Sequence, residues 1–130
     1  MMTNVAELEE QALAHMRNSR WADAVPLLKE LLDSNPNFEH GSPWYDLACC
    51  HDELGNVGEA RACYLRALSF DNNSPNFWGG WASFLYRHGD PREALNAFSK
   101  YRELVGEDSE LGKKVLPAID ALEKKLGHSS

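Results

Sequence analysis

Cys49, Cys50 and His51 stand next to one another in the sequence, and all three carry side chains that can bind a metal ion. Structural zinc sites use separated ligands, as in Cys-x-x-Cys, so that the side chains converge on one tetrahedral ion. On a helix, neighbouring residues point about 100° apart, because about 3.6 residues make one turn. Three consecutive helical residues therefore do not share a tetrahedral ion easily, and we expect no metal site here.

No other combination of residues in the chain forms a recognisable catalytic motif. The sequence has neither a glycine-rich phosphate loop nor the Gly-x-Ser-x-Gly elbow of a nucleophilic serine. Its 20 acidic residues are numerous, but a catalytic carboxylate pair needs an enclosed site that shifts its pKa values. We therefore expect a protein that is not an enzyme, with no catalytic residue and no cofactor.

The composition limits the classes of partner. Of the 130 residues, 43% are hydrophobic and 25% charged, which is ordinary for a globular protein with its own core. The net charge of −7 argues against nucleic acid and anionic membranes, since both attract basic surfaces. No apolar run approaches a membrane span, and the first residues lack the basic-then-apolar order of a signal peptide. Three cysteines, an odd number, predict reduced thiols and a cytoplasmic location.

The elements that position the side chains follow from a repeat with a period of 34 residues. Residues 44–68 align without a gap on residues 78–102, so that large apolar, small and turn residues coincide. A weaker copy precedes them, with two residues inserted around Glu39 and His40. The matched pairs of the two strong copies include Trp44 and Trp78, Leu47 and Trp81, Ala48 and Ala82, Gly55 and Gly89, Ala60 and Ala94, Tyr64 and Phe98, and Ala67 and Tyr101.

Each copy is predicted to be two helices joined by a short turn. In the third copy, the large apolar residues form two stripes at helical spacing. Between the stripes, Gly89 suits a helix end, Asp90 an N-cap and Pro91 a first helical turn. Ser42-Pro43 and Ser74-Pro75 are interpreted in the same way, as an N-cap followed by the first helical residue. One such hairpin cannot cover its own apolar face, so the hairpins are expected to stack.

This pattern of residues resembles the tetratricopeptide repeat (TPR) family over about residues 5 to 108. The resemblance implies an all-α fold, an α-solenoid of three antiparallel helix hairpins in a right-handed superhelix. We expect a single TPR-like domain over residues 1–130, with repeats at about 5–38, 41–74 and 75–108 and one C-terminal capping helix at about 109–126.

Two prolines leave alternatives open. Apolar residues between 111 and 126 form one stripe, which predicts a single capping helix with Pro117 on its solvent side. The alternative is two short helices broken near Gly112 to Pro117. In the second helix of the chain, Pro26 predicts a kink or a shifted start.

The resemblance also implies that the first helix of each hairpin lines an inner, concave groove. The groove is expected to be acidic at its centre, so that a basic or neutral peptide suits it. The carboxylate clamp by which some TPR domains hold heat-shock chaperones is not implied, because the matching positions carry no Lys or Arg. The predicted groove residues are Glu9, Leu13, Arg17, Tyr45, Asp46, Cys49, Asp52, Asn76, Gly79, Gly80, Ser83, Tyr86 and Arg87.

Gly79 and Gly80 lie between two tryptophans in a predicted helix, where each glycine costs about 1 kcal/mol relative to alanine. Three interpretations are open. The glycines form the floor of the groove, they allow close packing between helices, or they reflect drift at a permissive site. Exchange of both for alanine distinguishes the three, because only the groove floor predicts higher stability together with weaker binding.

We expect a non-enzymatic protein–protein interaction module that holds a peptide or helical segment of a partner protein in this groove. The alternatives are a structural TPR protein that self-associates and a small chaperone or adaptor of a secretion or assembly system. The three-repeat secretion chaperones represent the last class, although they carry an additional N-terminal dimerisation region. The identity of the partner, and whether the groove or the outer face binds it, does not follow from the sequence.

Overall fold

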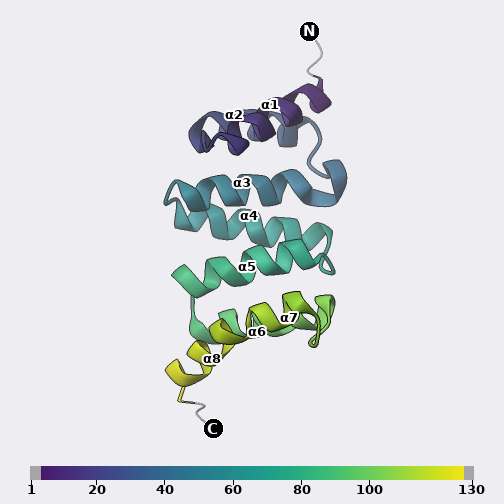
Figure 1. Ribbon diagram of the computed structural model, residues 1–130. Helices are drawn as coiled ribbons and strands as arrows, with labels where there is room; N and C mark the ends of the chain where they lie inside the picture. The colour runs from purple at the N-terminus through teal and green to yellow at the C-terminus, as the bar shows by residue number, and fades with distance from the viewer. Residues whose placement is uncertain (1–3, 128–130) are drawn as a thin grey trace. The chain divides into compact units, whose positions relative to one another are not determined.

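All regular secondary structure in residues 4–127, the part of the chain that the computed structural model describes, is helical (Figure 1). The prediction of an all-α fold without strands is therefore confirmed over these residues. The elements in chain order are α1 (Val5–Arg17), α2 (Trp21–Ser34), the short 3-10 helix η1 (Phe38–Gly41), α3 (Ser42–Glu53), α4 (Val57–Phe70), α5 (Pro75–His88), α6 (Pro91–Val105), α7 (Glu110–Lys114) and α8 (Leu116–Lys125).

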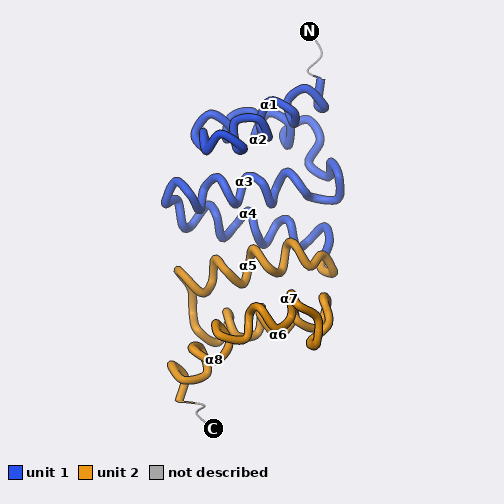
Figure 2. The backbone as a smooth tube through the Cα atoms, viewed as in Figure 1, with its two compact units in different colours: residues 1–71 blue, residues 72–130 orange. Residues whose placement is uncertain are grey.

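The chain folds as two compact units, the first ending at Asp71 and the second beginning at Asn72 (Figure 2). The first unit contains the hairpins α1–α2 and α3–α4, and α2 packs against α3. The second contains the hairpin α5–α6, against which α7 and α8 pack through α6. The predicted helix hairpins are thus present in both units, and each unit has its own buried apolar residues.

Small and large apolar residues alternate in the cores of both units. The positions that the repeat predicts to be small, such as Ala12, Ala24 and Ala60, are completely buried. Large side chains fill the space between them, and in the second unit the ring of Phe84 stacks on that of Trp81, with 5.7 Å between the ring centroids. Burial of each such side chain contributes about 1.5–3 kcal/mol, which is what holds the hairpins closed.

Most of the predicted helix starts are confirmed. The Ser74 hydroxyl accepts a hydrogen bond from the amide of Phe77 at 3.3 Å, and Pro75 begins α5. Asp90 caps α6 in the same way, and Gly89 ends α5. The prediction for Ser42 is wrong by one residue, because α3 begins at Ser42 itself.

The two inserted residues form a left-handed turn between the first and second hairpins. Glu39, His40 and Gly41 have φ angles of 46°, 55° and 91°. Two of the three are not glycine and carry the strain of this conformation. At Gly41, a Cβ would lie 2.8 Å from the Cβ of Phe70, so a side chain is excluded by packing as well. The insertion therefore changes the path of the linker and leaves both hairpins intact.

Helix α2 passes through Pro26 without interruption and begins at Trp21, so the predicted shift of its start is wrong. The proline is exposed and removes only the hydrogen bond that its amide would donate to the carbonyl of Ala22. On the opposite side of the helix, Leu28 and Leu31 are completely buried. Their burial outweighs the lost hydrogen bond.

The prediction of one continuous capping helix is wrong, and the alternative of two short helices is confirmed. Helix α7 ends at Lys114, and α8 begins at Leu116, with Val115 between them. Pro117 lies in the first turn of α8, where an amide hydrogen has no partner within the helix in any case. The proline therefore starts a second helix, on which Ile119 and Leu122 are buried.

The turn between α6 and α7 is built around Arg102. Its guanidinium donates hydrogen bonds to the carbonyl oxygens of Gly112 and Glu107, both at 3.1 Å. Ser109 caps α7, since its hydroxyl accepts a hydrogen bond from the amide of Gly112 at 3.0 Å. Gly112 is buried directly against the backbone of Gly106, which leaves no room for a side chain.

Candidate functional site

Three carboxylic acids from three different segments of the first unit form an acidic cluster: Glu9 on α1, Asp46 on α3 and Glu39 in the left-handed turn. Burial, followed by a hydrogen bond with Glu39 and the charges of Glu39 and Asp46, raises the pKa of Glu9 to about 7. Burial and the charge of Glu39 raise the pKa of Asp46 to about 6. The cluster therefore attracts protons or positive groups near neutral pH.

An uncharged polar patch lies next to the acidic cluster. The rings of Tyr45 and Tyr64 meet edge to face, with 5.8 Å between their centroids. The Cys49 sulfur lies 3.8 Å from the hydroxyl oxygen of Tyr64. Burial raises the pKa of Cys49 to about 11, and it also raises the pKa values of both tyrosines. All three groups are therefore uncharged at neutral pH, and they offer hydroxyl and thiol groups together with aromatic surface.

The structure brings together five of the predicted groove residues in the first unit. The charges of Asp46 and Asp52 both raise the pKa of Cys49, so the two aspartates flank the thiol. Leu13 is half-buried and Arg17 is exposed, and they follow Glu9 on α1 at intervals of four residues, which places them on one stripe. The five residues brought together are Glu9, Tyr45, Asp46, Cys49 and Asp52.

In the second unit, the predicted groove residues lie along α5 and differ in exposure. Gly80 and Ser83 are half-buried, whereas Asn76 and Arg87 are exposed. Tyr86 is 46% exposed, and its ring meets that of Phe98 edge to face at 6.2 Å between centroids. Tyr86 also borders a pocket of about 200 Å³ whose other wall is formed by Ala121, Leu122 and Lys125 of α8.

Gly79 faces the second helix of its own hairpin. A Cβ at this position would lie 3.0 Å from the Cε1 atom of Tyr101 on α6. This contact favours the close-packing interpretation of Gly79. One period earlier in the sequence, the same two positions hold Tyr45 and Ala67. In the earlier hairpin the large residue is on the first helix and the small one on the second. In the later hairpin the order is reversed.

We predict that the effect of Gly79→Ala depends on Tyr101. With Tyr101 present, the added methyl group forces the ring to move, and we expect a net loss of about 1 kcal/mol despite the better helix propensity of alanine. In a Tyr101→Ala background, the same substitution meets no ring and is expected to stabilise the protein by about 1 kcal/mol. Urea denaturation of the four proteins measures this coupling. Additive effects of the two substitutions would contradict the contact.

Two residues of this surface, Glu39 and Tyr64, were not predicted from the sequence. Tyr64 lies on α4, the second helix of its hairpin, and joins the patch because its hydroxyl group contacts the sulfur of Cys49. Glu39 belongs to the two-residue insertion, which is the only signal in the sequence that marks it. An insertion in a regular repeat is a place where the chain leaves the repeat geometry, and here it brings a carboxylate to the surface of α1 and α3.

Cys50 and His51, which follow Cys49 in the sequence, are part of the packed interior of the first unit. Cys50 is completely buried, and His51 is 4% exposed. The His51 ring nitrogens lie 3.2 Å from the amide nitrogen of Asn56 and 3.3 Å from a carboxylate oxygen of Glu59. Among residues 4–127, no three His, Cys, Asp or Glu side chains converge on a point where a metal ion could bind.

Comparisons with known proteins agree with this fold. The statistical model of the tetratricopeptide repeat family matches residues 9–75, just over half of the chain. No curated protein sequence matches the chain. Over the same described part of the chain, no helix combines the length and the apolar character needed to cross a membrane.

Several solved structures resemble the chain in fold. The Yersinia enterocolitica type III secretion chaperone SycD, in complex with a peptide of the translocator YopD, superposes with a TM-score of 0.83 at 20% identity, covering 93% of each chain. PcrH in complex with the chaperone binding region of PopD gives 0.82 at 19% identity, covering 93% of this chain and 92% of PcrH. MamA from MSR-1 gives 0.72 at 25% identity, covering 82% of this chain and 60% of MamA.

Proposed function

Because the chain belongs to the tetratricopeptide repeat family, we propose that it is a non-enzymatic module that binds a basic segment of a partner protein. The binding surface is the face of α1 and α3 that carries the acidic cluster and the uncharged patch beside it. The three cysteines are free thiols, which fits a role in the reducing cytoplasm.

The observation that carries this proposal is the acidic cluster itself. Burial raises the pKa values of Glu9 and Asp46, and the charge of Glu39 raises both further, so the three carboxylates repel each other when they ionise. A Lys or Arg side chain of a partner relieves this repulsion, and the aromatic rings of Tyr45 and Tyr64 provide contact area next to it. The helices hold these groups in place, so that binding costs little ordering of the module.

A chaperone or adaptor of a secretion or assembly system is a more specific version of the same proposal. Its support is the likeness in fold to SycD, solved with a peptide of the translocator YopD, and to PcrH, solved with the chaperone binding region of PopD. A self-associating protein is the remaining alternative, and light scattering over a range of concentrations distinguishes it from a monomeric module. The groove residues on α5 remain predicted contacts in the two versions that bind a partner protein.

We predict that a positional-scanning library of capped peptides contains binders enriched in Lys or Arg and depleted in Glu or Asp. Fluorescence polarisation of the selected peptides should give at least a tenfold lower affinity for Tyr45→Ala and for Glu9→Gln. The matched control is Glu10→Gln, which removes the same charge from the exposed neighbouring position of α1. Equal binding by Glu9→Gln and Glu10→Gln would contradict the proposed site.

The same measurement has an expected pH dependence. Because the pKa values of Glu9 and Asp46 are about 7 and about 6, their charges appear as the pH rises from 5 to 8. Basic peptides should therefore bind more tightly at pH 8 than at pH 5. The stability of the free protein changes in the opposite direction, since a carboxyl group with a raised pKa favours the folded state only while it is protonated. Glu9→Gln should flatten both profiles.

A further inference from the structure

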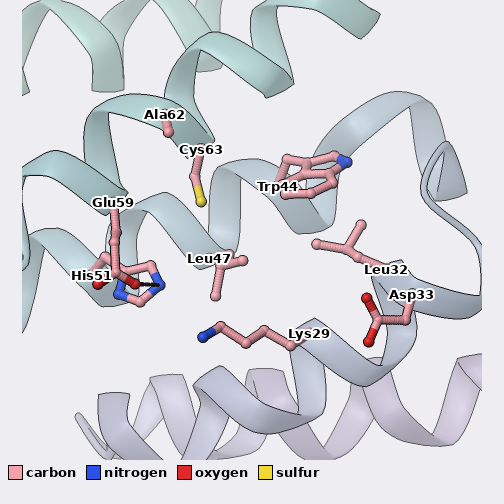
Figure 3. A pocket seen from close by; sticks show the side chains of 9 residues that line it. All are labelled: Lys29, Leu32, Asp33, Trp44, Leu47, His51, Glu59, Ala62 and Cys63. Carbon is pink, nitrogen blue, oxygen red and sulfur yellow. Dashed lines mark ion pairs between the residues drawn. The ribbon is translucent and has the colours of Figure 1, made fainter.

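A second recess in the first unit lies on a different side of α3 from the candidate groove. We call it the side pocket: it has a volume of about 360 Å³ and is lined by residues of α2, α3 and α4 (Figure 3). Trp44, Leu47 and His51 form its stripe on α3. The groove residues on this helix, beginning with Tyr45, are centred about 155° from this stripe around the helix axis.

The interior of the side pocket is largely apolar and is held in a fixed shape. Leu32, Leu47 and Cys63 are buried side chains that line it. The indole nitrogen of Trp44 donates a hydrogen bond to the carbonyl of Pro36 at 2.8 Å. The guanidinium of Arg66 lies 5.3 Å from the centre of the Trp44 ring. These contacts position the indole before any ligand arrives, so that filling the pocket costs little reorganisation.

The few polar groups inside the pocket are already engaged. His51 has a neighbour at each ring nitrogen, Asn56 at one and Glu59 at the other. Burial lowers the pKa of His51; the charge of Glu59 opposes this shift, and the charge of Lys29 adds a smaller lowering. Sites for small molecules orient their ligands with several convergent polar groups. Here the interior offers apolar surface, and a ligand must be oriented from outside the pocket.

Charged side chains surround the opening. Figure 3 shows Lys29 extending along the edge of the pocket, with Glu59 at the side of His51 and Asp33 on the side nearer Trp44. All three are exposed. Among the residues that line the opening, two carboxylates and one ammonium are present, so a basic partner residue finds a carboxylate on either side of the pocket. An apolar centre with a charged, solvated rim is the arrangement that surrounds an anchor residue in protein interfaces.

We propose that the side pocket holds one large apolar side chain of a partner polypeptide whose neighbouring residues are basic. The backbone of the partner orients the anchor, which explains why the pocket itself needs no free polar group. The basic neighbours complement the two carboxylates at the rim. This second recognition site belongs to the first unit alone and is separate from the acidic cluster.

The test is a titration followed by the ¹H–¹⁵N NMR spectrum of the full chain. The probe is a capped heptapeptide with the sequence Ser-Lys-Gly-Phe-Gly-Lys-Ser, compared with versions that carry Ala for Phe or Glu for both Lys. We expect saturable shifts at the Trp44 indole and at the amides of Lys29 and Ala62. The Ala version should bind at least tenfold more weakly, and the Glu version at least threefold more weakly.

Variants assign the binding to the pocket. Ala62 is exposed at the rim, so Ala62→Phe fills the opening and should weaken the Phe peptide at least tenfold. Ala22→Phe makes the same change at an exposed position of α2 outside the pocket and should leave affinity within twofold. Ala62→Leu serves as a milder block if circular dichroism shows that Ala62→Phe is misfolded.

Three outcomes would overturn the proposal. The first is that the Phe peptide causes no saturable shift at the pocket residues. The second is that the folded Ala62→Phe or Ala62→Leu variant binds as tightly as the parent. The third is that free toluene binds as tightly as the Phe peptide, which would identify the pocket as a site for small apolar molecules.

Discussion

A chain that ends at Gly106 is expected to lose the cooperative folding of its second unit. Helices α7 and α8 both pack against α6, and on α8 the side chains of Ile119 and Leu122 are 9% and 3% exposed. Each buried side chain of this size contributes about 1.5–3 kcal/mol. The loss of these two side chains alone costs about 3–6 kcal/mol, and exposure of the face of α6 that they cover adds to this cost. This is a large part of the 5–15 kcal/mol that stabilises a typical domain.

Thermal and urea denaturation followed by circular dichroism measure this effect. The control is a chain that ends at Gly127, which keeps α7 and α8 complete. Leu122→Ala is the milder version and should cost about 2–5 kcal/mol if α8 acts as a cover. A chain ending at Gly106 that unfolds like the full protein would mean that these two helices are dispensable.

Gly112→Ala is expected to destabilise the protein by about 3 kcal/mol or more, at the upper end of overpacking effects. A Cβ at Gly112 would overlap the carbonyl oxygen of Gly106 and lie 2.9 Å from that of Glu107. Both obstacles are backbone atoms, which move less readily than a side chain. Displacement of Gly112 would also disturb its carbonyl, to which Arg102 donates a hydrogen bond.

The matched control for this substitution is Gly58→Ala in α4. Gly58 has no atom within 4 Å of the position of a Cβ, so alanine should be neutral or stabilise the protein by up to about 1 kcal/mol. Urea denaturation of both variants therefore compares the same chemical change in a closed and an open environment. Equal stability of Gly112→Ala and Gly58→Ala would contradict the tight turn between α6 and α7.

The hairpins were predictable from the sequence because their apolar stripes coincide with their buried faces. Asp90-Pro91 and Ser74-Pro75 mark two helix starts in local sequence alone. The C-terminal segment was less predictable from the sequence, although its apolar stripe is equally regular. Leu111, part of that stripe, is 52% exposed. The break at Val115 lies just before Pro117, which starts α8, and the apolar periodicity alone does not mark such a break.

The candidate site was only partly predictable for a related reason. Residues on the inner stripes of α1 and α3 follow from the helix period, and Asp46 lies near enough to Glu9 for its charge to raise the pKa of Glu9, after burial and Glu39. Glu39, which completes the acidic cluster, lies in a left-handed turn formed by residues other than glycine. Such turns have a weak sequence signal. The packing partner of Gly79 was also not apparent, because it lies on the other helix of the hairpin.

The exchange of a large and a small residue between two hairpins restricts the order in which such sequences can diverge. One hairpin has Tyr45 and Ala67, and its duplicate has Gly79 and Tyr101 at the same positions. A single mutational step from either pairing leads to two tyrosines that compete for one volume or to two small residues that leave it empty. The intermediate with two small residues is tolerated better than the one with two tyrosines, since neighbouring side chains can partly relax into the empty space. Descent from one arrangement to the other therefore runs through a loosely packed intermediate, and transplanting either residue alone into a consensus repeat will fail without its partner.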